Sequence, residues 1–209
     1  MKKKDKVDFI INHFEQAMPD AQSELQFNSP YQLLVATMLA AQCTDKRVNM
    51  VTPALFKAYP TPLALSQATV EEILSYVKSV SYPNSKSAHL SAMSHMLVDE
   101  FQGVVPDDMD ALTRLPGVGR KTANVVLAFG FGKAAMPVDT HVFRVAHRLG
   151  LATDKDKTPE AVEKRLVSLF PHEYISRAHH WLLLHGRYTC IARKPKCETC
   201  ALQEICAGI

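Results

Sequence analysis

Four cysteines near the end of the sequence form its densest group of potential metal ligands. Cys190, Cys197, Cys200 and Cys206 follow one another at the spacing C-x6-C-x2-C-x5-C. Zinc ribbons usually pair two close cysteine knuckles, and here only Cys197 and Cys200 form one, so the spacing favours an iron–sulfur cluster held by four thiolates. A structural zinc ion and disulfide bonds are the alternatives that the spacing leaves open. The fifth cysteine, Cys43, lies in an apolar stretch and is expected to be a small core residue.

The composition favours a reducing compartment, in which thiols rather than disulfides persist. No apolar signal segment follows the charged N-terminus, and no apolar run is long enough to cross a bilayer. We therefore expect a cytoplasmic protein, associated with the nucleoid if its source is prokaryotic, that does not contact a membrane. The 24 Lys and Arg side chains outnumber the 21 Asp and Glu side chains, and the net charge of +3 permits a polyanionic partner without arguing strongly for one.

A glycine turn in the middle of the sequence has the features of an anion-binding site. Residues 115–123 read LPGVGRKTA, and Gly117 and Gly119 allow a sharp turn and the close approach of another surface. The first amides of the following helix are free to donate, and the helix dipole places about half a positive charge there. Arg120 and Lys121 would reinforce the binding of a phosphate. The alternative is an ordinary glycine-rich turn between two helices.

Short helices with brief connections are expected to carry both groups. Ser29-Pro30 is a helix start signal that opens the apolar run Leu33–Ala41, and this run predicts a buried central helix. No stretch alternates with period two for long enough to predict a strand, so the expected fold class is all-α. The expected N-caps are Thr69, Asp139 and Thr158. Further helices are predicted over Lys6–Ala17, Asp45–Ala58, Val70–Val77, Asn84–Phe101, Met109–Thr113, Arg120–Phe129, Thr140–Leu149, Pro159–Phe170 and Glu173–His185.

Three motifs relate the sequence to a known family. The LPGVGR string matches the helix-hairpin-helix motif, and it is followed by Lys121, by the segment Val138–His141 and by the four-cysteine tail. With these motifs in the family's order, the chain resembles the endonuclease III family of base-excision DNA glycosylases from about Phe9 to Cys206. The resemblance implies a bifunctional enzyme that removes oxidised pyrimidines from double-stranded DNA and nicks the resulting abasic site. It also implies a [4Fe–4S] cluster.

Two helical lobes are the architecture that this resemblance implies. One is a six-helix, barrel-like domain with the helix-hairpin-helix over residues 24–133. The other is a helical domain built from both termini, over residues 1–23 and 134–209, and it carries the cluster. DNA is expected to lie between the lobes, and the enzyme is expected to act as a monomer.

Lys121 and Asp139 are the expected catalytic residues. A lyase of this kind needs an amine that attacks the sugar C1′ and forms a Schiff base, which permits β-elimination of the 3′ phosphate, and Lys121 is the candidate. A free lysine, with a pKa of about 10.4, is neutral in about one molecule per 2,500 at pH 7, so the environment has to raise that fraction. In the resemblance, Asp139 stabilises the cationic sugar as the base leaves; its alternative role is that of a helix N-cap.

Wedge residues are expected because extruding a base leaves a gap in the DNA stack. Gln42 stands where the family places a glutamine that enters the helix opposite the lesion; without the resemblance it would be an ordinary polar surface residue. A second wedge normally comes from the loop before Asn84 and Lys86, where relatives show a glycine followed by an apolar residue. Here the loop reads SYP, so Tyr82 is the candidate for stacking, although the proline stiffens the loop. Asn84 and Lys86 are themselves expected to contact DNA.

Basic residues fill the loop between the first two cysteines of the tail. Arg193, Lys194 and Lys196 can balance the net negative charge of a cluster with four thiolates, or they can reach DNA phosphates, as the resemblance suggests. Both interpretations can hold together. Because β-elimination needs no net electron transfer, the cluster is expected to have a structural and DNA-docking role.

Two other functions fit parts of the sequence. An adenine mismatch glycosylase shares the fold and cluster, but that family carries a catalytic glutamate where Ala36 stands and lacks the lysine matched by Lys121. A non-catalytic DNA-binding module would use the hairpin to dock phosphates and a zinc ion as a staple. A yellow-brown solution would indicate iron–sulfur rather than zinc, and borohydride trapping on abasic DNA would indicate the enzyme.

Overall fold

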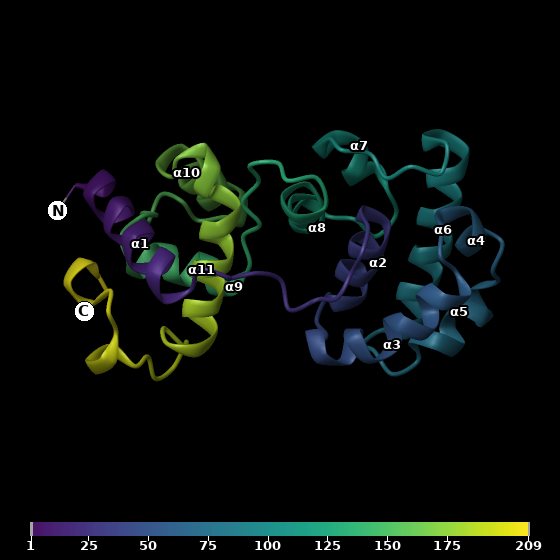
Figure 1. The fold of residues 1–209 in the computed structure, drawn as a ribbon, viewed down its shortest axis with the longest axis horizontal. Helices are drawn as coiled ribbons and strands as arrows, with labels where there is room; N and C mark the ends of the chain where they lie inside the picture. The colour runs from purple at the N-terminus through teal and green to yellow at the C-terminus, as the bar shows by residue number, and fades with distance from the viewer. Residues whose placement is uncertain (1, 209) are drawn as a thin grey trace. The chain divides into compact units, whose positions relative to one another are not determined.

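Helices make up the regular secondary structure of the residues that the structure describes (Figure 1). The computed structural model describes residues 2–208, and none of them lies in a strand, which confirms the predicted all-α class. The chain divides into two compact units. One unit is Ser23–Gly132, and the other combines the described parts of Met1–Gln22 and Lys133–Ile209. No helix within residues 2–208 is long and apolar enough to cross a bilayer.

The Ser23–Gly132 unit is built around a buried helix. Its helices are α2 (Pro30–Ala40), α3 (Asp45–Ala58), α4 (Pro62–Ser66), α5 (Val70–Val77), α6 (Pro83–Phe101), α7 (Met109–Arg114) and α8 (Arg120–Val125), and a π-helical turn continues α8 over Val126–Gly130. Ser29 begins α2 by accepting a hydrogen bond from the amide of Gln32, and every residue from Leu33 to Leu39 is buried. This helix packs against α3, α6 and α8. The predicted buried central helix is therefore confirmed.

Two local features of this unit differ from the predictions. The helix α4 was missed, although Thr61 caps it by accepting from the Ala64 amide at 3.1 Å and Pro62 occupies the first helical position. Five residues are too few for hydrophobic periodicity to show. The helix predicted over Arg120–Phe129 changes from α to π at Val126, and sequence periodicity does not distinguish those two forms.

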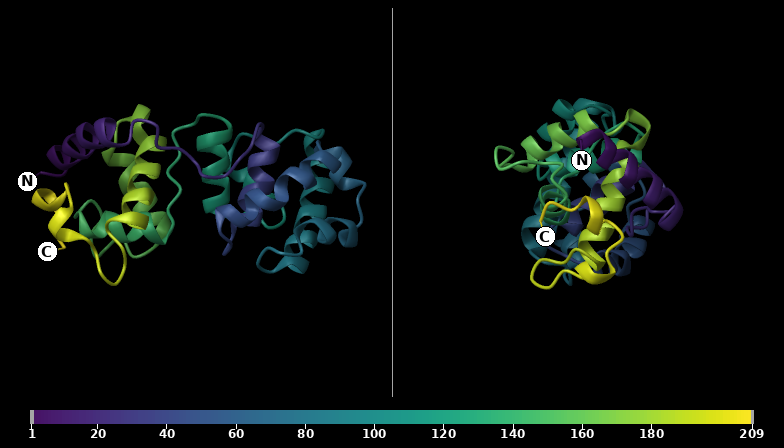
Figure 2. Two further views of the ribbon diagram at one scale, coloured as in Figure 1. Left: turned by 60° about the horizontal axis from the view of Figure 1, so that its bottom comes forward. Right: turned by 90° about the vertical axis from the view of Figure 1, so that its left-hand side faces the viewer.

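The other unit has a core to which both ends of the chain contribute (Figure 2). Its helices are α1 (Lys3–Ala17), α9 (Thr140–Arg148), α10 (Pro159–Leu169) and α11 (Ile175–Tyr188). Trp181 is fully buried, its ring lies 5.9 Å from that of Phe14, and its indole N–H donates to the Met18 carbonyl at 3.1 Å. Leu202 and Ile205, from the C-terminal segment drawn in yellow, pack into the same core. Trp181 therefore belongs to a core against which Cys190, Cys200 and Cys206 also pack.

Candidate functional site

The glycine turn between α7 and α8 is closed by its own backbone. The Val118 amide donates to the Leu115 carbonyl at 3.0 Å, and both side chains are buried. Gly117 has φ +78°, and a Cβ there would lie 2.9 Å from the Cβ of His89, so both the conformation and the space require glycine. Gly119 is the N-cap of α8, and a Cβ at this position would meet open space. The turn thus leaves its Gly119 side accessible to another surface.

Lys121 lies in the first turn of α8 and is exposed. Its neighbour Arg120 is exposed as well. The N-cap of α8 is a glycine without a side-chain acceptor, so no capping side chain competes with an external anion there. The structure therefore places an amine, a guanidinium and the positive end of a helix around one turn, the arrangement that the sequence predicted.

Asp139 caps the helix α9 in the other unit. Its Oδ1 atom accepts from the amide of His141 at 2.9 Å and from the amide of Val142 at 2.8 Å. These bonds confirm the predicted N-cap. The residue is half-buried, so the carboxylate has a fixed orientation and remains partly accessible. A catalytic role requires both properties of a group that is to stabilise a developing positive charge.

Gln42 and Tyr82 adopt a backbone conformation that is uncommon for residues with side chains. Gln42 has φ +55° and Tyr82 has φ +54°; Gln102 is the one other non-glycine residue with positive φ within residues 2–208. The left-handed conformation costs roughly 1–2 kcal/mol for an L-residue. Both predicted wedge residues are exposed, and Tyr82, the N-cap of α6, is 64% accessible. Asn84, in the first turn of α6, is also exposed.

Lys86 does not present its amine to solvent. The residue is 7% accessible, and its Nζ donates to the carbonyls of Leu39 and Ala41, each at 2.7 Å. Burial lowers the pKa of the Lys86 ammonium below its usual value, and nearby Cys43 opposes that shift. The prediction that Lys86 contacts DNA is therefore wrong, because both hydrogen bonds hold its ammonium inside the unit, at the end of α2.

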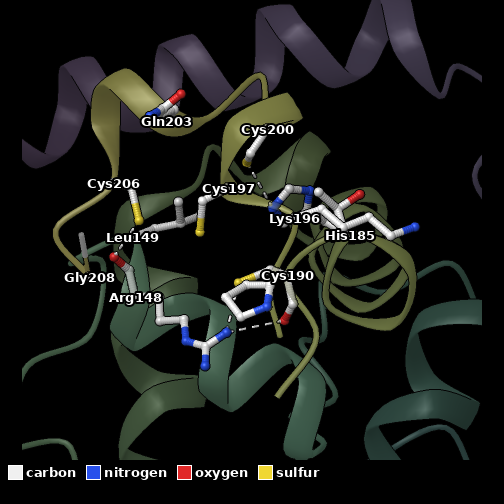
Figure 3. A pocket seen from close by; sticks show the side chains of 12 residues that line it. Arg148, Leu149, His185, Cys190, Lys196, Cys197, Cys200, Gln203, Cys206 and Gly208 are labelled. Carbon is white, nitrogen blue, oxygen red and sulfur yellow. Dashed lines mark hydrogen bonds between the residues drawn. The ribbon is translucent and has the colours of Figure 1, made fainter. Parts of the chain in front are cut away.

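The four cysteines of the tail line one cavity (Figure 3). The cavity has a volume of about 100 Å³, and Cys190, Cys197, Cys200 and Cys206 all lie on its wall. All five cysteines of the chain are free thiols, so disulfides are excluded. Burial raises the pKa of the Cys200 thiol. The other three cysteines add to this shift, whereas a hydrogen bond with the Leu202 backbone opposes it. Four thiolates gathered around one cavity would repel one another, and a positively charged centre between them offsets that repulsion.

The four cysteines suit an iron–sulfur cluster better than a single zinc ion. Four thiolates around a single zinc ion at 2.3 Å would bring the sulfur atoms within about 3.8 Å of one another. Within residues 2–208, however, no group of three or more His, Cys, Asp or Glu side chains is placed to hold a single metal ion. Sulfur atoms spread around a cavity suit a cluster, in which each thiolate binds a different iron.

Arg148, at the end of α9, holds both ends of the cysteine loop (Figure 3). Its Nη1 lies 3.3 Å from the Sγ of Cys190, and its Nη2 donates to the Ala192 carbonyl at 2.9 Å. Its own carbonyl oxygen lies 3.3 Å from the Sγ of Cys206 and accepts from the Ala207 amide at 2.9 Å. One residue of the helix that begins at Asp139 thus contacts the first and the last cysteine.

Two further side chains support the same loop. The Nε of Arg144 donates to the Cys190 carbonyl at 3.1 Å, and its Nη2 donates to the Gly186 carbonyl at 2.8 Å. The Nε2 of His185 lies 3.7 Å from the Sγ of Cys200. Burial, and secondarily nearby His13, lowers the pKa of His185 to about 4. Sequence reasoning missed Arg144, Arg148 and His185 because no local spacing relates them to the cysteines.

The three basic residues of the cysteine loop are exposed. Arg193, Lys194 and Lys196 lie on the segment between Cys190 and Cys197, and the Lys196 amide donates to the carbonyl of Thr189 at 3.0 Å. The segment therefore presents three cations on a backbone that is tied to the end of α11. Of the predicted DNA-contact residues other than Lys86, each lies at an accessible position.

Two family models match the chain. The model of the HhH-GPD superfamily base excision DNA repair protein matches residues 35–172, and the iron-sulfur binding domain of endonuclease III matches residues 190–206. The fold and the cysteine site together define a helix-hairpin-helix DNA repair protein with an iron–sulfur domain.

Similar proteins narrow this class to one family. Endonuclease III of Rickettsia conorii is 46% identical over 200 residues, which cover 96% of this chain and 94% of the relative. Endonuclease III of Escherichia coli K12 is 44% identical over 197 residues, which cover 94% of this chain and 92% of the relative. A solved structure of a trapped endonuclease III–DNA covalent intermediate matches with a TM-score of 0.92 and 40% identity, covering 100% of this chain and 97% of the other. The chain belongs to the endonuclease III family.

Family membership defines the activity in outline. The protein is a bifunctional DNA glycosylase and abasic-site lyase of base excision repair, it binds DNA, and it carries a [4Fe–4S] cluster. The predicted family, enzyme class and cofactor are confirmed. A zinc-stapled, non-catalytic DNA-binding module does not describe this chain.

Proposed function

We propose that the enzyme excises oxidised pyrimidines from double-stranded DNA and cleaves the abasic strand with Lys121 as its covalent nucleophile. The exposure of Lys121 in the first turn of α8, directly after the glycine turn, carries this proposal. A phosphate bound at the open Gly119 side of the turn would bring its sugar close to this amine. The covalent endonuclease III–DNA intermediate trapped in a relative supports covalent chemistry in the family.

The bond changes follow from an amine acting on deoxyribose. The neutral Lys121 amine attacks C1′, the bond from C1′ to the base breaks, and the base leaves with a proton. The lone pair of Nζ then forms a double bond to C1′ while the bond between C1′ and the ring oxygen O4′ breaks; O4′ takes up a proton and becomes a hydroxyl, which leaves a protonated Schiff base between Nζ and C1′. A proton then leaves C2′, the C3′–O bond breaks, and the 3′ phosphate departs. Water finally hydrolyses the imine and returns the lysine.

Asp139 is proposed to stabilise positive charge on the sugar while the base leaves. Its Oδ1 is held by the amides of His141 and Val142, so the carboxylate does not have to reorient during the reaction. Stabilising the sugar needs the negative charge of the carboxylate, whereas capping α9 needs only an oxygen acceptor, so one group can serve both roles.

Gln42 and Tyr82 are proposed to occupy the space that the extruded nucleotide leaves. Both project from exposed turns with left-handed backbone. Tyr82 offers an aromatic face for stacking, and such a contact contributes roughly 1–3 kcal/mol per base. Asn84 follows Tyr82 by two residues in the first turn of α6. It is proposed to contact the DNA strand on which Tyr82 stacks.

Cys190, Cys197, Cys200 and Cys206 are proposed as the cluster ligands. Each contributes a soft thiolate, and the cluster supplies a rigid, charged centre rather than a step of the excision chemistry. Arg193, Lys194 and Lys196 are proposed to dock DNA phosphates from the loop that the cluster holds. Affinity should then fall steeply as salt rises, because each neutralised phosphate releases counterions.

The proposed setting is a monomer on duplex DNA in the cytoplasm. One chain carries the amine, the carboxylate and the cysteines, so no second copy is needed to complete the site. Cysteines that take part in no disulfide bond suit a reducing compartment.

Duplexes with different lesions test the proposed substrate class. Borohydride trapping should give a covalent adduct with a duplex that contains an oxidised thymine and with an abasic duplex. Duplexes with an oxidised purine or with intact bases should give little adduct. Strong trapping on the oxidised purine and none on the oxidised thymine would contradict the substrate class, although it would leave the Schiff-base chemistry in place.

Replacing Asp139 separates its catalytic role from its capping role. Asp139→Asn keeps a good N-cap acceptor, so the melting temperature should change little, whereas base release in a single turnover should slow about a hundredfold. Asp139→Ala serves as the comparison, since it loses the cap as well and should lower stability by about 1 kcal/mol. Base release by Asp139→Asn at the wild-type rate would show that Asp139 acts only as a cap.

A further inference from the structure

Lys86 connects the ends of two helices inside the Ser23–Gly132 unit. Its Nζ donates to the carbonyls of Leu39 and Ala41, and Ala41 directly precedes Gln42. The last carbonyls of a helix have no intrahelical partner, and they form the negative end of the helix dipole. An ammonium that binds two of them therefore fixes the path of the chain as it enters the Gln42 turn.

The backbone of Lys86 is bonded to the second wedge turn. Its amide donates to the Tyr82 carbonyl at 3.1 Å, and this bond closes the first turn of α6. Gln42 and Tyr82 both have left-handed backbone, which persists only where the surroundings enforce it. Lys86 is bonded to the residue that precedes Gln42 and to Tyr82 itself, so one residue joins two strained turns that lie far apart in the sequence.

A purely space-filling role does not account for these contacts. An apolar side chain of similar length would fill the volume at lower desolvation cost, but it would leave the Leu39 and Ala41 carbonyls without this donor. A direct phosphate contact is also excluded, because the residue is 7% accessible and its ammonium lies against the end of α2.

We propose that Lys86 is a positioning residue for base extrusion: it holds the Gln42 and Tyr82 turns in one fixed arrangement, so that both side chains enter the duplex together. This inference rests on the proposed function of those two side chains as wedges. Lys86 touches neither the sugar nor the Lys121 amine in this scheme. It acts on the step that opens the duplex, and the later covalent chemistry does not depend on it.

Two substrates separate the opening step from the chemistry. A duplex with an oxidised thymine requires extrusion, whereas an abasic site in single-stranded DNA has neither a base to extrude nor an opposite strand to fill. For Lys86→Met, the single-turnover rate on the duplex should fall about tenfold to a hundredfold relative to the rate on the single strand. Lys86→Arg keeps hydrogen-bond donors at this site and should recover part of the duplex rate. Lys57→Met, at an exposed position of α3, is the matched control and should leave the ratio of the two rates unchanged.

A fluorescent base opposite the lesion gives a second readout. An analogue such as 2-aminopurine brightens when it loses its stacking partners, and this brightening on binding should shrink in Lys86→Met while the Schiff-base adduct on single-stranded abasic DNA still forms. In a background that already carries Gln42→Ala and Tyr82→Ala, adding Lys86→Met should change the duplex rate little, because the residues act as one unit.

Equal losses on both substrates would show that Lys86 only stabilises the fold, and they would overturn the inference. Wild-type rates of Lys86→Met on both substrates would overturn it as well, and so would a full additional loss of the duplex rate in the background that lacks both wedge side chains. Failure of the proposed function is distinguishable from these outcomes, since in that case the wild-type enzyme itself forms no adduct with either substrate.

Discussion

The Leu115–Gly119 turn is closed by its own backbone and by buried neighbours, whereas the Cys190–Cys206 loop is closed from outside. In the turn, Leu115 and Val118 are buried and are bonded to each other. In the loop, the four cysteines are only half-buried, and the regular structure consists of two short 3-10 turns. Side chains from α9 and α11 hold that loop instead. The turn that presents Lys121 should therefore keep its shape without the cluster, while the loop should not.

Removing a cluster ligand should have the largest effect. Cys200→Ser should lose the visible absorbance of the cluster and destabilise its unit by more than about 4 kcal/mol, as losses of metal sites do. Hydrogen exchange should speed up over residues 186–208, while the Val118 and Ala123 amides, bonded to the carbonyls of Leu115 and Gly119, remain protected. Cys43→Ser, in the other unit, should keep the cluster. Equal loss of protection in the turn and in the loop would refute the difference between the two regions.

A change at Arg148 isolates the part of the loop's support that comes from α9. Arg148→Met loses the donors to the Cys190 thiolate and to the Ala192 carbonyl, which should cost about 1–3 kcal/mol and speed oxidative loss of the cluster. Arg148→Lys keeps the positive charge but lacks the planar guanidinium group, so the cluster should be lost at a rate between those of the wild type and Arg148→Met. Lys164→Met, at an exposed position of α10, serves as the control. Cluster decay at the wild-type rate in Arg148→Met would show that the thiolates alone close the loop.

The smallest effects are expected when the two glycines of the hairpin turn are replaced. Gly117→Ala places a Cβ 2.9 Å from His89 and forces a left-handed φ on alanine, so it should cost about 1–2 kcal/mol of stability. Gly119→Ala meets open space and should change the free energy of unfolding by no more than about 0.5 kcal/mol. DNA affinity should nevertheless fall in Gly119→Ala, because phosphate binding brings another surface to this position. Thermal unfolding measures the change in stability, and DNA titration measures the change in affinity. An unchanged DNA affinity of Gly119→Ala would show that the phosphate does not bind at Gly119.

Local signals predicted much of the molecule from sequence. Ser29, Thr69, Asp139 and Thr158 all cap helices as expected, because capping depends on residues only two or three positions away. The spacing of the cysteines likewise limits how far apart their sulfur atoms can lie. The fully apolar run that forms α2 predicted a buried helix without any knowledge of its neighbours.

Long-range side-chain partners could not be predicted in this way. Lys86 and Leu39 are 47 residues apart, and Arg148 and Cys190 are 42 residues apart. A lysine in the first turn of a helix, or an arginine in the last, is usually solvated, and nothing in the neighbouring sequence indicates that either side chain turns inward. Sequence reasoning therefore assigned Lys86 to DNA and overlooked Arg148, and the packing of helices distant in sequence determines both roles.

Locating the covalent bond tests the account most directly. The wild-type enzyme would be reduced with borohydride in the presence of abasic duplex DNA, digested, and analysed by mass spectrometry, with Lys121→Gln treated in parallel. The account predicts a deoxyribose remnant on the peptide that contains Lys121, and no adduct in Lys121→Gln. A remnant on another residue, or equal trapping by the variant, would contradict it.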